Sequence, residues 1–235
     1  MWKLWLKRVL AGMAPSQVMP SAGIGSRGRM SQMTTERGTS DRNGPVEHEG
    51  SEEARDEVEQ ALAPVRVALD SVSETQLAEV AHEIAKAKVV ACLGAGREGL
   101  MMRALTMRLF HAGVDAHYVG DMTCPALGEE DVLLVSLGPG SLASIEAIAD
   151  RARGASARVV GFTAQPELVR AELLDHVVPI DAQTMASDQG SDSVLPMGSA
   201  FEIALLVLTD LVSRRVRELA GGTAEQMRRR HTNLE

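Results

Sequence analysis

Two glycine-bearing segments are the parts of this sequence best suited to hold a ligand. The first covers residues 93–99 (LGAGREG) and the second covers residues 135–141 (VSLGPGS). Each follows a short apolar run and precedes an amphipathic helical pattern, which is how an open parallel sheet presents backbone N–H groups to an anionic or polyhydroxy ligand. We therefore expect a substrate site between them, formed by Gly94, Gly96, Arg97, Glu98, Gly138, Gly140 and Ser141.

The first segment also fits two other interpretations. Residues 94–99 match the G-x-G-x-x-G pattern, and Asp121 follows near the end of the next expected strand, where a dinucleotide-binding protein places a ribose-binding carboxylate. Against an NAD(P)-dependent enzyme, Glu98 would bring a negative charge near the pyrophosphate. A tight strand-to-helix turn, which needs glycine only for its backbone geometry, would give the same pattern. The spacing alone leaves these alternatives open.

An alternation of short apolar runs and amphipathic helices surrounds the two segments. It predicts an α/β fold, a doubly wound and mostly parallel sheet of five strands with helices on both faces. The expected strands cover residues 89–93, 116–119, 132–135, 159–162 and 177–180, and the expected helices cover residues 100–112, 142–153, 167–174 and 200–219. Both glycine-bearing segments then follow strands and precede helices.

Two helices are expected before the first strand. The earlier one begins near Glu52 and should break or kink at Pro64. The later one follows Ser73, which forms a capping-box pattern with Gln76. Residues before this helical segment have another character: the first 35 include five basic residues and no acidic one. They resemble a transit peptide, although a start codon placed too far upstream would look the same.

We therefore expect residues 1–50 to be a disordered leader and residues 51–235 to be the folded domain with its N-terminal helices. The expected location is the cytoplasm, or a plastid or mitochondrion if the source is eukaryotic and the leader is a transit peptide. The formal charge of −8 and the 3% aromatic content argue against a nucleic-acid partner. No apolar run reaches membrane-spanning length. Cys92 and Cys124 form neither a disulfide framework nor a metal-ligand pattern.

Five further blocks extend the pattern of the first segment. They are residues 107–109 (MRL), 120–125 (GDMTCP), 182–184 (AQT), 196–202 (PMGSAFE) and 230–235 (RHTNLE). Together they resemble the sugar isomerase (SIS) domain, and within it the 6-phospho-3-hexuloisomerase branch, over about residues 55–235. The chain is also similar to plant and algal proteins described only as sugar isomerase domain-containing.

This resemblance implies an aldose–ketose type isomerase that acts on a sugar phosphate or related derivative through an enediol, without metal or other cofactor. It places Glu202 as the catalytic base, although Ser199 and Glu202 also read as a capping box. It makes His231 the candidate for ring opening or proton relay in a neighbouring subunit, and so implies a homodimer or homotetramer. A polar tail residue in solvent is the alternative for His231.

Both glycine-bearing segments depart from the family. The second usually reads S-G-S-G-E-T, whereas residues 137–142 read LGPGSL, and Pro139 has no N–H to donate. In the first, Glu98 replaces a serine that faces the ligand. Arg97 could clamp a phosphate, or form an ion pair with Glu98 or a neighbouring acid. A non-catalytic sugar-phosphate sensor or regulator on the same fold is therefore the alternative function.

Overall fold

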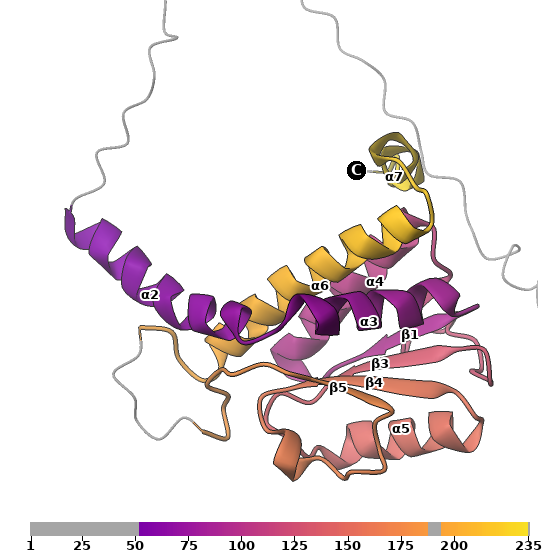
Figure 1. Ribbon diagram of the computed structural model, residues 1–235, viewed down its shortest axis with the longest axis horizontal. Helices are drawn as coiled ribbons and strands as arrows, with labels where there is room; N and C mark the ends of the chain where they lie inside the picture. Colours follow the sequence, from indigo (N-terminus) through magenta and orange to yellow (C-terminus); the bar gives the residue numbers. More distant parts are fainter. Residues whose placement is uncertain (1–51, 188–193, 235) are drawn as a thin grey trace, which may run out of the picture. The chain divides into compact units, whose positions relative to one another are not determined.

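The five strands form one entirely parallel sheet, as the alternation predicts (Figure 1). In the computed structural model, which describes residues 52–187 and 194–234, the strand order is β2-β1-β3-β4-β5. The strands are β1 (Val90–Leu93), β2 (Ala116–Tyr118), β3 (Val132–Ser136), β4 (Arg158–Thr163) and β5 (His176–Pro179). Strands β1 and β3 are buried along their whole length because helices cover both faces of the sheet. The expected leader lies outside the described residues.

Helices α2, α3, α4 and α6 pack over one face of the sheet and helix α5 over the other (Figure 1). Their bounds are α2 (Glu52–Asp70), α3 (Glu74–Lys86), α4 (Gly96–Ala112), α5 (Ala143–Gly154) and α6 (Ser199–Leu219). A further short helix that the sequence did not predict, α7 (Ala224–Arg230), follows α6. None of the described helices is long and apolar enough to cross a membrane.

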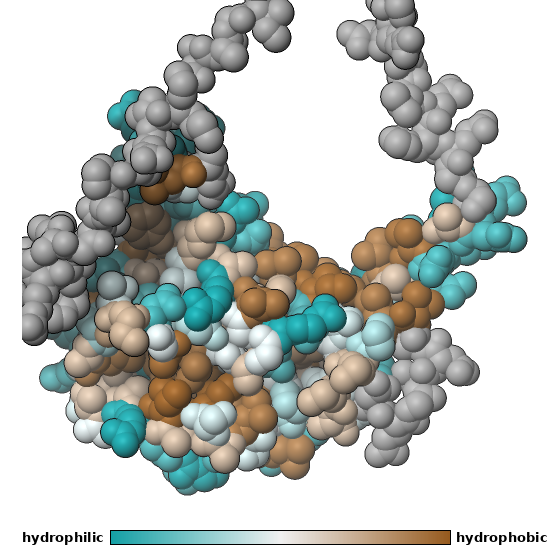
Figure 2. Space-filling model, turned by 180° about the vertical axis from the view of Figure 1, so that it is seen from behind, coloured by the Kyte–Doolittle hydropathy of each residue, from teal (hydrophilic) through white to brown (hydrophobic). Residues whose placement is uncertain are grey.

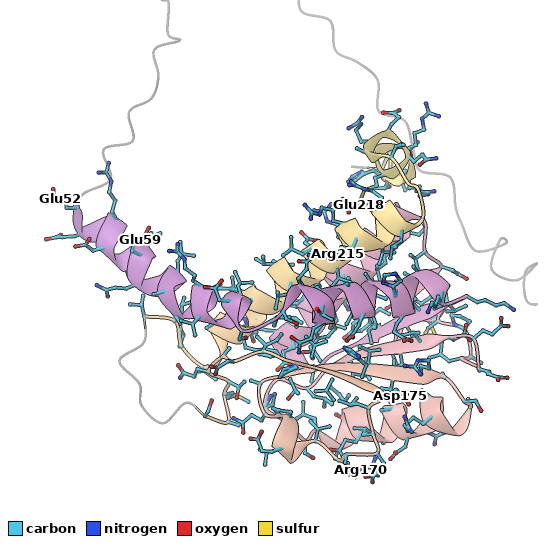
Figure 3. The ribbon with its side chains drawn as sticks, viewed as in Figure 1. Glu52, Glu59, Arg170, Asp175, Arg215 and Glu218 are labelled. Carbon is cyan, nitrogen blue, oxygen red and sulfur yellow. The ribbon has the colours of Figure 1, made fainter. Side chains whose placement is uncertain are left out.

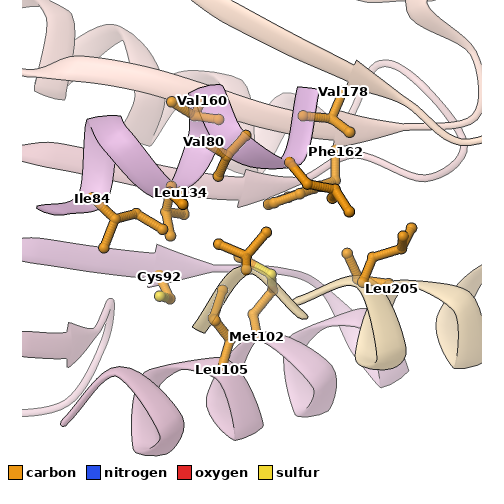
Figure 4. Close-up of a cluster of buried hydrophobic side chains, with 14 of the residues drawn as sticks. Val80, Ile84, Cys92, Met102, Leu105, Leu134, Val160, Phe162, Val178 and Leu205 are labelled. Atoms are coloured by element: carbon orange, nitrogen blue, oxygen red, sulfur yellow. The ribbon is translucent and has the colours of Figure 1, made fainter. Parts of the chain in front are cut away.

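The larger core lies between the sheet and the four helices of the first face (Figure 4). Phe162 of β4, Met102 of α4 and Leu205 of α6 meet there, each almost fully buried. At roughly 25 cal/mol per Å² of apolar surface, this burial is the main force that holds the helices on the sheet. Helices α4 and α6 are therefore fixed side by side, and their N-terminal ends are the ones that matter for the site.

Charged side chains such as those of Arg170 and Arg215 lie near the surface (Figure 3), and some of them form ion pairs between neighbouring elements. Arg215 of α6 lies 2.5 Å from Glu74 at the start of α3, and Arg170 lies 2.6 Å from Asp150 of α5. Ion pairs at the surface contribute little to stability, because water and salt screen their charges. Packing of the apolar faces, more than these charges, decides where the helices lie.

Helix α2 does not break at Pro64, which is one of the two outcomes expected there, because Val65 and Ala68 on the same helix are buried against the domain. One expectation about a helix is wrong. Residues 167–174 do not form a helix: only a 3₁₀ turn, η1 (Pro166–Leu168), is present. After it the chain runs back towards the sheet, where the N–H of Asp175 donates to the carbonyl of Val159. The capping box of Ser73 and Gln76 is confirmed.

Candidate active site

A cavity of about 310 Å³ opens at the carboxyl ends of the strands, beside the first loop (residues 94–99) and the second loop (residues 136–142). The strand order reverses between β1 and β3, and such a switch point is where open α/β sheets bind ligands. The lining residues come from both loops, from the segment before α6 and from the first turn of α6: Ala95, Gly96, Arg97, Glu98, Pro139, Leu142, Thr184, Met185, Pro196, Met197, Gly198, Ser199, Phe201 and Glu202.

Glu98 joins the two loops through its carboxylate. Its Oε2 accepts a hydrogen bond from Ser136 Oγ at 2.5 Å and another from the N–H of Gly138 at 3.0 Å. Burial raises the pKa of Glu98, and the hydrogen bonds from Ser136 and Gly138 oppose that rise. The sequence predicted Glu98 as a ligand-binding residue but did not predict this link to the second loop.

A side chain at residue 138 would crowd both Glu98 and Phe201. A Cβ atom at this position would lie 2.5 Å from Oε1 of Glu98 and 2.8 Å from the ring of Phe201. Gly140 has a φ of 91°, in the left-handed region that glycine adopts without strain. Neither glycine lines the cavity, and neither does Gly94, beside which a Cβ would meet the backbone of Gly99 at 2.9 Å. These three predicted binding residues shape the loops instead.

Arg97 and Glu202 both line the cavity and form an ion pair. The Nε of Arg97 lies 2.8 Å from Oε2 of Glu202, and a guanidinium N–H of Arg97 reaches Ser199 Oγ at 3.5 Å. Within the described residues Oε2 is buried and accepts no hydrogen bond, so the contact between the two charges is electrostatic without a directed bond. Burial raises the pKa of Glu202, the charge of Arg97 lowers it, and the charge of Glu98 raises it.

The start of α6 points Glu202 into the cavity. The helix is preceded by two residues with positive φ, Met197 at 56° and Gly198 at 95°, and no side chain caps it. The expected capping box is therefore wrong: Ser199 Oγ donates to the carbonyl of Pro196 at 2.8 Å, and Glu202 turns towards Arg97. The side chain of Glu202 is 13% exposed, so it keeps contact with the cavity while losing most of its hydration.

Ser141 and Asp121, which the sequence suggested as ligand-binding residues, instead contact other side chains of the protein. Ser141 does not line the cavity, and its hydroxyl donates to Glu146 of α5 at 2.6 Å. Asp121, the carboxylate that a dinucleotide site would need, lies 3.0 Å from Arg103. With Glu98 also filling the space beside the second loop, the arrangement gives no support to pyrophosphate binding at this turn.

His231 lies at the other end of the helices. It follows α7 directly, and its ring stacks on that of His111 with centroids 5.2 Å apart. Glu98 lies in the first turn of α4 and His111 in the last, and a helix of 17 residues is about 25 Å long. One chain therefore does not bring His231 and Glu202 into the same cavity.

Several lining residues were not singled out from the sequence. Thr184, Met185 and Met197 reach the cavity from the segment before α6, and Pro139 and Leu142 reach it from the second loop. The blocks at residues 182–184 and 196–202 carried a signal for the first group, since both belong to the family resemblance. Pro139 and Leu142 lie where the chain departs from that pattern. Among the described residues, no group of three or more His, Cys, Asp or Glu is arranged to hold a metal ion.

Comparisons with known proteins identify relatives that include proteins named 3-hexulose-6-phosphate isomerase. No protein-family model matches the chain. The 3-hexulose-6-phosphate isomerase of Mycobacterium gastri is 38% identical over 182 residues, which cover 77% of this chain and 87% of the relative. The enzyme of the same name from Bacillus subtilis is 32% identical over 165 residues, covering 70% and 89%.

Solved structures show the same fold at lower identity. A hypothetical protein from Methanococcus jannaschii, whose structure was described as inferring a function of 3-hexulose-6-phosphate isomerase, has a TM-score of 0.66 and 24% identity, covering 77% of this chain and 99% of that one. A putative sugar-phosphate isomerase from Listeria monocytogenes has a TM-score of 0.62 and 20% identity, covering 77% and 98%.

Proposed function

Because this chain belongs to the sugar isomerase (SIS) domain family, as a homologue of 3-hexulose-6-phosphate isomerases, we propose that it moves a carbonyl between adjacent carbons of a sugar phosphate through an enediol. The observation that carries the proposal is Glu202: a carboxylate that lines the cavity with its side chain only 13% exposed, and whose Oε2 is buried against Arg97. A carboxylate that faces a cavity and has lost most of its hydration is suited to take a proton from carbon.

Glu202 is the proposed base. With the sugar in its open-chain form, the carboxylate takes the proton from the carbon next to the carbonyl, and the electron pair of that C–H bond moves into the carbon–carbon bond to give an enediolate. The hydroxyl proton of the first carbon then passes to the oxygen of the former carbonyl, and the carboxylic acid returns its proton to the former carbonyl carbon, so that the carbonyl is now on the first carbon. Burial favours this role, because a carboxylate that has lost hydration is more basic than one in water.

Arg97 is the proposed partner of the substrate's phosphate. It is the one cation among the described residues that line the cavity, and its side chain is 61% exposed although it lies beside Glu202. A phosphate bound to the guanidinium would compete with Glu202 for the positive charge of Arg97. The attraction that lowers the pKa of Glu202 would then weaken at the moment when substrate binds, and the base would become stronger.

We include His231 in this proposal as a residue supplied by a second subunit. Its distance from Glu202 within one chain requires this. Figure 2 shows apolar side chains gathered along the projecting end of α2 and over the neighbouring surface. Exposed apolar residues on α2, α4 and α6 support self-association, and they are Val58, Leu62, Val67, Leu100, Met107, Phe110 and Val207. A homodimer or homotetramer is therefore part of the proposal.

We also propose that the chain belongs with the plant and algal SIS proteins and is located in an organelle. It is supported by the basic composition of the leader. A fluorescent fusion of the full chain, compared with a fusion that lacks residues 1–50, tests it in a plant or algal cell. Equal distributions of the two fusions would contradict it.

The second candidate function is a sensor that binds a sugar phosphate without turnover. The altered second loop favours it, because Pro139 and Leu142 replace groups that could hold the ligand. Structures of similar fold include the NanR protein of Vibrio vulnificus complexed with ManNAc-6P, at 17% identity and a TM-score of 0.58. That likeness concerns the fold alone.

One experiment separates the two functions. Hexulose, hexose and pentose phosphates, and the unphosphorylated sugars, are incubated with the protein in D₂O, and NMR follows the exchange of hydrogens next to the carbonyl. Protein-dependent deuteration of one compound supports the isomerase, because exchange reports the enediol even when net conversion is small. Binding of a compound without deuteration would support the sensor.

A further inference from the structure

Glu98 occupies the place where a sheet of this order would receive the anionic part of a ligand. The strand order reverses between β1 and β3, and the first and second loops follow these two strands. Backbone N–H groups at such a point normally face a bound anion. Here the carboxylate of Glu98 itself accepts the N–H of Gly138 at 3.0 Å and the hydroxyl of Ser136 at 2.5 Å.

Between Ser136 and Gly140, the other hydrogen-bond donors of the second loop are also in use. The N–H of Leu137 donates to the carbonyl of Phe162 at 2.8 Å, and the N–H of Gly140 donates to the carbonyl of Leu137 at 2.8 Å. Pro139 has no N–H, and the hydroxyl of Ser141 is taken by Glu146. From Ser136 to Gly140, these groups therefore leave a phosphate nothing to bind unless Glu98 moves away.

The fit between Glu98 and the second loop is close. Oε1 of Glu98 lies only 2.5 Å from the point where a Cβ of residue 138 would be, so the carboxylate uses the space that the glycine leaves open. The backbone of Glu98 belongs to the first turn of α4, and the hydrogen bonds from Ser136 and Gly138 hold its carboxylate. The carboxylate is therefore a built part of the cavity wall.

We infer that Glu98 is a specificity-determining residue that acts as an internal anion: it fills the anion position between the two loops, so that the sugar hydroxyls face Glu98 and the phosphate lies at Arg97. This inference rests on the proposed function for its substrate class. It assigns opposite ends of the ligand to two neighbouring residues of α4. A carboxylate accepts hydrogen bonds from hydroxyl groups and repels a phosphate, whereas a guanidinium donates charge-assisted hydrogen bonds to a phosphate and attracts it.

The test measures binding of inorganic phosphate, by calorimetry and by ³¹P NMR, to four proteins: wild type, Arg97→Ala, Glu98→Ser and the double variant. Arg97→Ala should weaken phosphate binding at least about tenfold. Glu98→Ser frees the hydroxyl of Ser136 and the N–H of Gly138, so the double variant should regain binding to within about threefold of wild type. The control is Glu129→Ser combined with Arg97→Ala, which removes one negative charge from an exposed position outside the cavity. It should not restore the phosphate binding that Arg97→Ala weakens.

Two results would overturn the inference. If Arg97→Ala binds phosphate as wild type does, the phosphate does not lie at Arg97. If the double variant stays as weak as Arg97→Ala, Glu98 does not occupy an anion position. Should Glu98→Ser fail to fold, Glu98→Gln serves instead: loss of the charge should tighten phosphate binding about threefold or more, and an unchanged affinity counts against the inference.

Failure of the proposed function would look different. Binding of inorganic phosphate involves no turnover, so the pattern among the four proteins can hold even if no sugar phosphate is deuterated in D₂O. In that case the isomerase proposal would fall and the assignment of Glu98 would stand.

Discussion

The Nε of Arg97 lies 2.8 Å from Oε2 of Glu202, and this ion pair joins the first turns of α4 and α6. Burial raises the pKa of Glu202 while Arg97 lowers it, so the basicity of the carboxylate depends on what else the guanidinium binds. The pair thus links ligand binding to proton transfer.

The first prediction concerns Glu202 itself. Glu202→Gln should reduce deuterium exchange into the substrate by about 10²–10⁴-fold, because the amide has a similar shape but cannot take the proton. NMR in D₂O measures the exchange, and circular dichroism checks that the fold is intact. Glu218→Gln, at the exposed end of the same helix, is the matched control and should exchange at the wild-type rate. Exchange that survives Glu202→Gln would remove Glu202 from the mechanism.

The second prediction concerns pH. The acid limb of kcat/KM should follow the pKa of Glu202, above that of an ordinary glutamate, because only the ionised carboxylate is a base. Arg97→Ala removes the charge that lowers this pKa, so its limb should move to higher pH. Glu98→Gln removes a charge that raises it, so its limb should move to lower pH.

Profiles of kcat/KM between about pH 4 and 8 measure these shifts. The two variants must move the limb in opposite directions. A shift in the same direction for both would mean that the limb belongs to another group.

The third prediction concerns stability. The pKa of Glu98 is raised in the folded state, so the folded protein binds this proton more tightly than the unfolded chain does. Its contribution should therefore become more favourable as pH falls through the raised value towards the ordinary value, and the cost should be fully present above the raised value.

Urea unfolding of wild type and Glu98→Gln, at neutral and at mildly acidic pH, measures this contribution. Wild type should gain stability relative to the variant as the pH is lowered. Parallel pH dependences of the two proteins would contradict the buried position of Glu98.

Much of the fold could be predicted from local patterns. The strands lie within one or two residues of their expected bounds, because each is a short apolar run, and α4 ends at Gly113 in the left-handed conformation expected of a C-terminal glycine. The capping box at Ser73 needed only residues three positions apart. Short-range signals of this kind are present in the sequence itself.

The contacts within the site could not be predicted in the same way. Arg97 and Glu202 are brought together only by the packing of α4 on α6, and Glu98 reaches Gly138 only because β1 and β3 are neighbours. Ser199 and Glu202 read as a capping box, but the left-handed backbone of Gly198 begins the helix without one. Tertiary packing determines which partner each of these side chains contacts.

The fourth prediction concerns Gly138. Gly138→Ala should lower the free energy of unfolding by about 1–3 kcal/mol, because its Cβ would lie within 2.8 Å of both Glu98 and Phe201. Gly154→Ala is the matched control, since nothing lies within 4 Å of a Cβ there. The control should be neutral or stabilising by about 0.4–1 kcal/mol.

Urea unfolding measures both variants, and a double variant with Glu98→Ser tests the cause. Removal of the Glu98 carboxylate should recover part of the loss, leaving the contact with Phe201. Equal losses with and without Glu98 would show that the carboxylate does not limit the space at residue 138.

The last prediction tests whether two chains share one site. His231→Gln should lower exchange while leaving the cavity around Glu202 unchanged, because His231 lies beyond the far end of α4 in its own chain. If a second subunit supplies His231, unfolding and refolding an equal mixture of Glu202→Gln and His231→Gln should restore activity. In a dimer, half of the refolded molecules would be hybrids with one intact site of two, so about one quarter of wild-type activity should return. Recovery in this mixture, with none when either variant is refolded alone, requires a shared site. No recovery in the mixture, from hybrids shown to form by mass spectrometry, would show that a second subunit does not supply His231.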